Sequence, residues 1–446
     1  MSKLFGNTGG AHAASRSHAS PKPRRAAAPA SPDRAESPAA AAPVRSRKRG
    51  RGGKVLCTIL AVLIAGYCLF AFVPVAPFRT LRNMYIETAL STMRHQWLAT
   101  AFFPKSIVES VRQEMRDAQQ SQNGVNSGWG QGSDGSFTPP TIPEEDNPTL
   151  NAGDPAMEAF FQLFWELDRE ETRAWLDENP AYLENGWAHL TADASGLDED
   201  GLPLHTAQGE QVLAIDAENG VLLLRVTGTG YRGVLAVAKD PSRLTLQPSA
   251  NLGTMGQNAG DIAQAHDGLL AMTASGFIDE GGHGKGGTVT GFALCDGTAY
   301  GTHFGSGYKR LELRKNDLLY LTDATAAVSD DATDAMEFTP ALIVDGKTVV
   351  DSSCGWTAIN PRASLGQSDR GEILMLVIEG RLTTSLGTDV MECAAILARH
   401  SCMQAMNMDG GTSAILWYNG RYVTRCSNTA LPAGRLLPNA WVYGKK

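Results

Sequence analysis

The sequence has few cysteines, and none is placed as metal sites or disulfide frameworks require. Two of the seven, Cys57 and Cys68, lie in an apolar run, and the other five are scattered over the rest of the chain. Because five is an odd number and no two cysteines have C-x-x-C spacing, neither a complete set of disulfides nor a thiolate zinc site follows.

Positive charge is scarce outside the first 54 residues. These residues hold twelve Lys and Arg against Asp33 and Glu36, a net charge of +10. The whole chain has a net charge of -8, which leaves -18 for the remainder. Because a nucleic-acid-binding domain is itself basic, an acidic body with a basic tail predicts no nucleic acid partner.

Only one long run lacks charge, from Val55 to Phe78. At about 1.5 Å per residue it is long enough to cross a hydrocarbon core of about 30 Å. RSRKRGRGGK precedes the run, whereas only Arg79 and Arg82 follow closely. The positive-inside rule therefore predicts a single-pass cell-membrane protein with a cytoplasmic N-terminus and an extracytoplasmic C-terminal domain. A cleaved signal peptide is the rival interpretation, although the basic region and the apolar run are both longer than usual for one.

Helices and strands do not alternate regularly after residue 205, which excludes a doubly wound sheet. Short branched segments punctuated by Gly, Asp and Pro predict strands, and Asp-Gly pairs at 296–297 and 345–346 predict hairpins. One helix is predicted from Asp389 to Arg399, with Glu392 completing a capping box. We expect an α+β fold, a mixed β-sheet domain with few helices, after a transmembrane helix and a helical stalk.

Composition divides the chain into six segments. The segments are a disordered basic tail (1–54), the anchor (55–78), a juxtamembrane helical stalk (79–120), a linker (121–150), a helical accessory segment (151–200) and the sheet domain (201–446). The sequence sets neither the oligomeric state nor the role of residues 81–200.

The run NMDGGTS, residues 407–413, carries more polar groups and glycines than a plain hairpin needs. Asn407 and Asp409 are two apart on a predicted strand and so share a face. Gly410 and Gly411 allow backbone N–H groups to line an anion-binding concavity, to which Thr412 and Ser413 add donors. The plainer alternative is a β-turn with an Asx cap.

Two further clusters hold candidate binding residues. The glycine-rich loop 272–287 predicts a binding lip that includes Ser275, Gly276, Asp279 and His283, or simply a solvated loop. A metal site through Asp279, Glu280 and His283 has no recognised ligand spacing. At predicted strand edges lie Arg362 and Arg381, which we expect to clamp a phosphate, and Glu379, a candidate acid; surface ion pairs are the alternative for these three.

Taken in order, these clusters resemble the phosphodiester glycosidase family over about residues 205–446. The matching stretches are GVLAVAKDPSR, ASGFIDEGGHGKGG, NPRASLGQSDRGEILMLVIEGR, NMDGGTS and GRLLPNAW. Three positions depart from the family pattern. Thr273 stands where the family has an Asn, whose amide is expected to contact substrate; Glu379 replaces the Asp of a DGR motif, and Thr412 replaces a third glycine.

The resemblance implies hydrolysis of a sugar-1-phosphodiester in a glycan or cell-envelope polymer, as in bacterial exopolysaccharide proteins. Asp409 is the expected base or nucleophile, a role that Asp279 or Glu379 could exchange with it. The expected substrate-binding residues are Asn407, Gly410, Gly411, Thr412, Ser413, Ser275, Gly276, His283, Arg362 and Arg381. No cofactor is expected, and a divalent metal is left open. Two alternatives remain: a non-catalytic envelope protein that binds anionic glycan or an exopolysaccharide assembly partner, and a metal-dependent phosphodiesterase that cuts the P–O bond.

Overall fold

The computed structural model describes residues 51–92, 95–129, 154–279, 283–353 and 355–446. Within these residues the chain forms eight α-helices and three antiparallel sheets, which confirms the predicted α+β class. Contacts divide the chain into two compact units, residues 1–61 and 62–446. The predicted disordered tail lies almost entirely outside the described residues.

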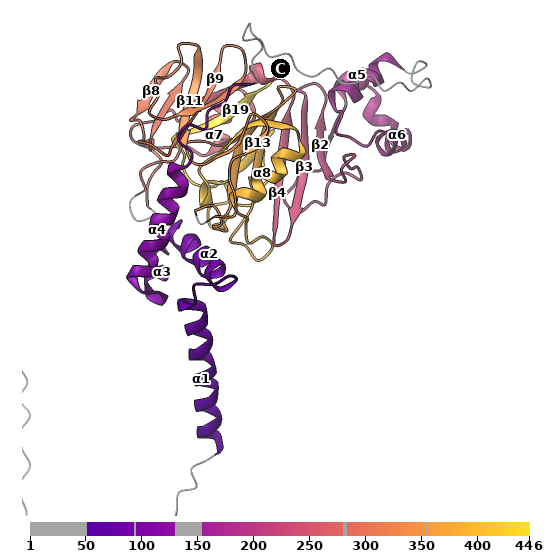
Figure 1. Ribbon diagram of the computed structural model, residues 1–446. Coiled ribbons are helices and arrows are strands. Elements are labelled where there is room, and N and C mark those ends of the chain that lie inside the picture. Colours follow the sequence, from indigo (N-terminus) through magenta and orange to yellow (C-terminus); the bar gives the residue numbers. More distant parts are fainter. Residues whose placement is uncertain (1–50, 93–94, 130–153, 280–282, 354) are drawn as a thin grey trace, which may run out of the picture. The chain divides into compact units, whose positions relative to one another are not determined.

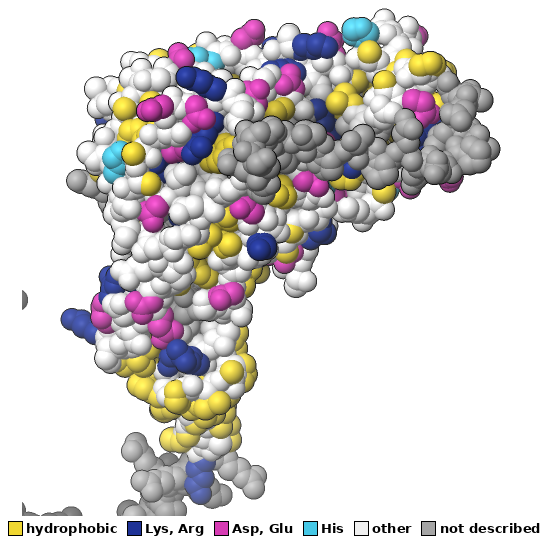
Figure 2. All heavy atoms as spheres, turned by 45° about the horizontal axis from the view of Figure 1, so that its top comes forward, with side chains coloured by type: hydrophobic (Ala, Val, Ile, Leu, Met, Phe, Trp, Pro, Cys, Tyr) yellow, Lys and Arg dark blue, Asp and Glu magenta, His cyan; other side chains and the backbone are white. Residues whose placement is uncertain are grey.

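The uncharged run forms helix α1 (Arg51–Phe72). Its segment Gly53–Phe72 is long and apolar enough to cross a membrane, and a signal sequence would have the same properties. The helix ends two residues before Pro74, because a residue preceding proline is disfavoured in the helical conformation. Figure 2 shows hydrophobic side chains gathered over this helix and the helices that follow it, whereas acidic and basic side chains mix elsewhere on the visible face.

Three helices follow, α2 (Phe78–Leu90), α3 (Trp97–Phe102) and α4 (Lys105–Gln120). They share a small core in which Ile86, Phe103 and Val108 are buried. After α4 the chain runs into the sheet domain: Gln122 accepts a hydrogen bond from the Ala341 N–H at 2.9 Å, and the Trp129 indole donates to the Leu319 carbonyl at 2.8 Å. Residues 130–150 of the predicted linker lie outside the described residues.

The largest sheet has nine strands in the order β1-β2-β3-β4-β15-β14-β16-β12-β13. Its strands are β1 (Thr191–Asp193), β2 (Gln211–Asp216), β3 (Val221–Gly228), β4 (Tyr231–Ala238), β15 (Ile373–Ile378), β14 (Arg362–Ser368), β16 (Cys402–Asn407), β12 (Ala341–Val344) and β13 (Lys347–Thr348). The central strand β15 is buried along its whole length, as its unbroken apolar sequence requires.

Two five-stranded sheets pack against the nine-stranded one. One has the order β10-β9-β11-β7-β8, with β10 (Leu319–Asp323), β9 (Lys309–Arg314), β11 (Ala332–Phe338), β7 (Phe292–Cys295) and β8 (Thr298–Gly301). The other has the order β18-β17-β6-β19-β5, with β18 (Arg421–Tyr422), β17 (Leu416–Tyr418), β6 (Gly268–Thr273), β19 (Asn439–Gly444) and β5 (Leu244–Pro248).

The main core lies between these sheets, and helices cover the outer faces. Helix α8 (Val390–Arg399) packs on the nine-stranded sheet (Figure 1), together with α5 (Pro155–Leu163) and α6 (Arg169–Glu178). Helix α7 (Ala259–Ala265) covers the smaller β6 sheet.

Local predictions hold at three places. The side chain of Asp389 accepts a hydrogen bond from the Glu392 N–H, which confirms the predicted cap of α8. The Asp-Gly pairs at 296–297 and 345–346 form two-residue hairpin turns in which both residues have positive φ. These turns match the right-handed twist of the strands.

Candidate active site

Asp409 lies where the ends of several strands meet. It follows β16 by two residues, and its N–H donates to the Ala274 carbonyl at 3.1 Å, just after β6. The neighbouring Met408 N–H donates to the Ala363 carbonyl at 2.8 Å, at the start of β14. These bonds bring the NMDGG, MTASGF and NPRAS stretches together, although more than a hundred residues separate the first from the last of them in the chain.

The Asp409 carboxyl group has the properties of a reactive group. Desolvation raises its pKa to about 6, which outweighs the lowering effects of a Ser413 hydroxyl hydrogen bond and of the Arg435 charge. The charge of Asp279 raises the pKa further. A carboxyl group with a pKa near neutrality, inside a group of charged residues, is typical of acid–base and nucleophilic sites.

The second glycine after Asp409, Gly411, makes room for an arginine, whereas Gly410 lies against the Pro361 carbonyl. Gly411 has a φ of +61° and donates its N–H to the Pro361 carbonyl at 3.0 Å, so this N–H is not a free anion donor. A Cβ atom on Gly411 would lie 3.3 Å from Nη1 of Arg381. Glycine suits position 411 because the Arg381 guanidinium group packs over the backbone there.

Arg381 differs from an ordinary surface arginine. Its φ is +57°, a conformation that costs free energy for a non-glycine residue. Its Nη2 donates to Oδ1 of Asn360 at 2.7 Å, and no carboxylate within the described parts of the chain lies within 4.0 Å. Desolvation and the nearby Arg362 charge lower its pKa. An arginine without an acidic partner is suited to an anionic ligand.

Arg362 is used differently from Arg381. Its Nε donates to the Thr388 carbonyl at 3.2 Å, and its Nη2 donates to the Ala358 carbonyl. Burial lowers its pKa, while the charges of Cys393, Asp389 and Glu87 raise it. The guanidinium group thus holds two backbone segments together, and the pair of arginines predicted as a phosphate clamp is not symmetric.

Glu379 is buried and paired. Its Oε2 lies 3.5 Å from Nε of Arg232, and its Oε1 accepts a hydrogen bond from the Arg425 N–H at 2.8 Å. These contacts hold the chain just after the end of β15, two residues before Arg381. They favour the ion-pair interpretation that the sequence left open.

Asp279 also has a cationic partner, Arg435. The two side chains form a bidentate pair in which Arg435 Nη2 donates to Asp279 Oδ1 at 2.8 Å and Nη1 donates to Oδ2. The Gly284 N–H donates to Oδ1 at 2.6 Å, and the guanidinium group lies 4.5 Å from the centre of the Phe277 ring. Asp279 therefore lies close enough to Asp409 to affect its pKa, but the Arg435 guanidinium group already balances the Asp279 charge.

Sequence reasoning missed Arg435 and Asn439 as site residues. Asn439 Oδ1 accepts from the Ser275 N–H at 3.0 Å, and its Nδ2 donates to the Ser275 hydroxyl at 3.0 Å. Both residues lie in GRLLPNAW, which was used only as a mark of resemblance. The signal that could have identified them is that this run resembles a family motif and contains an arginine and an asparagine.

The other predicted binding residues occupy varied positions. Asn407 Nδ2 donates to the Thr339 carbonyl at 3.0 Å, and its Oδ1 is buried without a partner. Ser275 and Thr273 are fully buried, and the Thr273 hydroxyl has no partner. Gly276 packs against Phe338, and His283 is exposed. Thr412 accepts a hydrogen bond from the Ser427 hydroxyl at 3.1 Å.

Metal ligands do not gather in the described parts of the chain, where no group of three or more His, Cys, Asp or Glu side chains is placed to hold an ion. Glu280, which the sequence grouped with Asp279 and His283, lies outside those parts. Two surface hollows of 680 and 430 Å³ lie against α8 and β3 and share Thr227 and Arg399. Neither hollow is lined by Asp409.

Within the described residues, this α+β fold holds a carboxyl group with a raised pKa, that of Asp409, at strand ends that also carry Arg381 and Arg435. Residues 267–443 match the family model described as phosphodiester glycosidase, and the chain therefore carries a phosphodiester glycosidase family domain. The match spans the Asp279, Arg381, Asp409 and Arg435 positions, which confirms the resemblance found in the sequence.

Similar proteins share limited identity with this chain. The SPbeta prophage-derived uncharacterized protein YomE of Bacillus subtilis is 24% identical over 182 residues, which are 37% of this chain and 27% of that protein. The chain thus matches about a quarter of that relative's length. The catalytic domain of zebrafish N-acetylglucosamine-1-phosphodiester alpha-N-acetylglucosaminidase, auto-inhibited by its pro-peptide, aligns with a TM-score of 0.43 and 15% identity over 59% of this chain and 90% of that one.

Two further solved structures align more weakly. A hypothetical protein from Synechocystis has a TM-score of 0.38 and 13% identity, over 54% of this chain and 66% of its own. A putative exported protein from Burkholderia pseudomallei has a TM-score of 0.35 and 15% identity, over 48% of this chain and 74% of its own.

Proposed function

We propose that the chain is a membrane-anchored, extracytoplasmic phosphodiester glycosidase that hydrolyses a sugar-1-phosphodiester in a glycan or cell-envelope polymer. The family domain supports the reaction class, and the apolar helix α1 with its preceding basic run supports the anchor. One observation carries the proposal: the Asp409 carboxyl group, with a pKa raised to about 6, lies two residues from Gly411, over which packs an arginine that has no acidic partner within the described residues.

In the proposed reaction the bond between the sugar C1 and the phosphate oxygen breaks. Its electron pair leaves with the phosphate, and a water oxygen ends on C1. Phosphate is a good leaving group, so the site needs charge stabilisation more than it needs a strong general acid. Arg381 supplies this stabilisation from its place over Gly411. Asp409, in its charged form, acts as the base that takes the water proton or as the nucleophile at C1.

The remaining residues hold Asp409 in place. Ser413 and the Gly410 N–H donate hydrogen bonds to the carboxylate, which orients it. The charges of Asp279 and Arg435 both act on the pKa of the Asp409 carboxylate. Because Asp279 is paired with Arg435, it does not compete with Asp409 for the proton of the attacking water. Asn407 anchors the end of β16 through the hydrogen bond from its Nδ2 to the Thr339 carbonyl, and its buried amide oxygen has no partner within the described residues.

A second candidate is a non-catalytic envelope protein that binds an anionic glycan. One observation favours it: Thr273, at the position where the family pattern has Asn, is fully buried and so offers no group to a sugar from solution. In that case Asp409→Asn leaves the affinity for a teichoic-acid-like or exopolysaccharide fragment intact, and no product forms.

The test is an assay of the full-length chain in detergent micelles on a panel of sugar-1-phosphodiesters. We expect Asp409→Asn to lower kcat/KM by a factor of at least about 1,000, because the substitution keeps the shape but removes the charge. Asp317→Asn is the matched control, since Asp317 also has a raised pKa but lies in a turn of another sheet. Unchanged turnover by Asp409→Asn would refute the assignment.

A further inference from the structure

The loop that carries Asn360 joins the site to the first helix after the apolar segment. Asn360 is almost fully buried, and its backbone exchanges two hydrogen bonds with Thr388, each of 3.0 Å. Its side chain bridges two partners: Oδ1 accepts from Nη2 of Arg381 at 2.7 Å, and Nδ2 donates to Oγ of Ser91 at 2.9 Å. Ser91 is the C-cap residue of α2.

The hydrogen bonds that link Arg381, Asn360 and Ser91 can have only one donor–acceptor arrangement. Arginine can only donate, so the carbonyl oxygen of the Asn360 amide must face Arg381 and its amino group must face Ser91. The Ser91 oxygen then accepts, and its own proton is donated to the Thr88 carbonyl inside α2 at 2.9 Å. The bridge therefore runs in one direction, and reversing the amide would break both of its side-chain bonds.

Ser91 belongs to a polar face of α2 that is bonded to this loop. The Glu87 carboxylate, fully buried, accepts from the Thr357 N–H at 3.1 Å and from the Thr357 hydroxyl at 3.0 Å. The Thr88 hydroxyl accepts from the Ile359 N–H at 3.1 Å. Positions 87, 88 and 91 lie on one side of a helix, so a single helix face grips three residues of the loop.

We infer that α2 is part of the active site, with Ser91 and Asn360 acting as positioning residues that aim the Arg381 guanidinium group at the substrate phosphate. The inference rests on the proposed function, because it takes Arg381 as the phosphate ligand. It gives residues 78–91 a role beyond that of a spacer. It also means that a fragment beginning at the sheet domain has an incompletely oriented site.

Positional control matters here because no carboxylate among the described residues holds Arg381. Its polar partner is a neutral amide oxygen, which orients the guanidinium group without neutralising its charge. An acidic residue in place of Asn360 would compete with the substrate phosphate for the same cation. A buried asparagine whose other end is tied to a helix gives orientation and leaves the charge for the ligand.

The test is a titration of the full-length chain with inorganic phosphate by calorimetry, alongside kinetics on the best phosphodiester. Ser91→Ala removes one hydrogen bond of the bridge, and we expect phosphate binding to weaken by about three- to tenfold. Ser91→Thr, which keeps the hydroxyl, should restore it. Asn360→Asp keeps the shape and adds the competing charge, and we expect a larger loss that high salt reduces.

Two controls separate positioning from general damage. Ser110→Ala, on the exposed face of α4, should leave phosphate binding unchanged. In an Arg381→Gln background, Ser91→Ala should have no further effect, since the bridge acts through Arg381.

Each remaining outcome counts against a specific claim. An equal loss from Ser91→Ala in both backgrounds, or no loss in the wild-type background, overturns the inference alone. Failure of the wild-type chain to bind phosphate or to turn over any phosphodiester overturns the proposed function together with it.

Discussion

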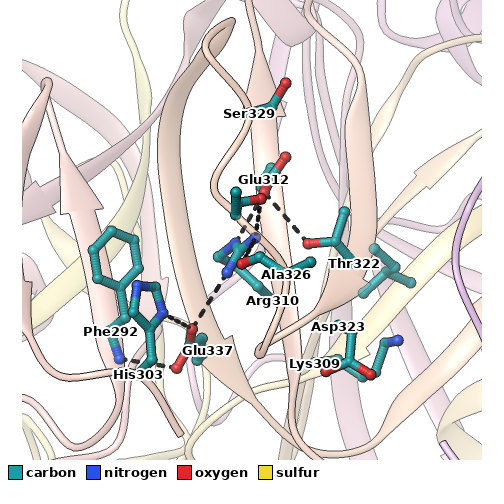
Figure 3. A network of polar contacts seen from close by, with 12 residues as sticks. Phe292, His303, Lys309, Arg310, Glu312, Thr322, Asp323, Ala326, Ser329 and Glu337 are labelled. Atoms are coloured by element: carbon teal, nitrogen blue, oxygen red, sulfur yellow. Dashed lines mark hydrogen bonds and ion pairs between the residues drawn. The ribbon is translucent and has the colours of Figure 1, made fainter. Parts of the chain in front are cut away.

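The protein has two clusters of arginine and carboxylate side chains, and they differ in how completely their charges are paired. The first lies within the sheet that contains β9 and β11, where Arg310, Glu312 and Glu337 are fully buried (Figure 3). The second is the strand-end cluster around Asp409 and Arg381. The first cluster sits on strands, and the second sits on the segments that directly follow β15 and β16. The two clusters also differ in the partners of their charged groups.

Every charge of the first cluster has partners. Arg310 Nε donates to Glu312 at 2.9 Å, its Nη1 lies 3.6 Å from Glu337, and its Nη2 donates to the Ala326 and Ala327 carbonyls at 3.1 and 2.8 Å. Glu337 also contacts His303 Nδ1 at 2.6 Å. Nη1 of Arg310 makes no hydrogen bond within the described residues, and its only charged neighbour there is Glu337. Buried charges need oppositely charged or hydrogen-bonding partners to be tolerated.

The second cluster is incomplete by the same standard. Arg381 has a strained backbone and no acidic partner within the described residues, and Asp409 holds a raised pKa. Neither feature stabilises the fold. The comparison teaches that complete pairing marks a structural cluster, while unpaired charge held in place by packing marks a binding site.

Breaking the complete cluster should have the largest effect on stability. Arg310→Met removes the cation that Glu312 and Glu337 share and, in the described part of the chain, leaves them only Arg314 and His303, respectively, as side-chain partners of basic type. We expect the free energy of unfolding to fall by about 3–5 kcal/mol. Arg381→Gln is the matched variant in the other cluster and should change stability by less than about 1 kcal/mol while weakening phosphate binding. Thermal and urea unfolding of the full-length chain in micelles measure both, and equal losses would remove the distinction.

A smaller effect concerns pH. Because the pKa of folded Asp409 is raised to about 6, its charged form is disfavoured in the native state. The stability contributed by this group is present below about pH 4 and is lost as the pH rises through about 6. Wild-type stability should therefore fall relative to Asp409→Asn over this window, whereas kcat/KM should rise through it. A kcat/KM that falls between pH 5 and 7 would assign Asp409 the role of a general acid instead.

The sequence was sufficient for features that depend on local patterns. The capped helix at Asp389, the two Asp-Gly hairpins and the α+β class each follow from turn chemistry or periodicity, and the structure has them. The NMDGG motif made Asp409 a candidate for the same kind of reason, since paired glycines after an aspartate are unusual in a plain turn; the structure places this residue where strand ends meet.

The sequence could not give the pairing of charges. Arg362 and Arg381 look equivalent in it, yet Arg362 donates to two backbone carbonyls and Arg381 donates to the side-chain amide of Asn360. Gly411 was expected to provide an N–H for an anion, but Pro361 takes that bond. The contact between Ser91 and Asn360 joins positions 269 residues apart, which no local pattern encodes.

The central claim is that this site cleaves the sugar C1–O bond. Hydrolysis of a sugar-1-phosphodiester by the full-length chain in ¹⁸O-labelled water, followed by mass spectrometry of both products, tests it most directly. We predict that the label enters the sugar and that the phosphomonoester stays unlabelled. Label in the phosphomonoester would show that the P–O bond is cut and would contradict the assignment of Asp409 and Arg381.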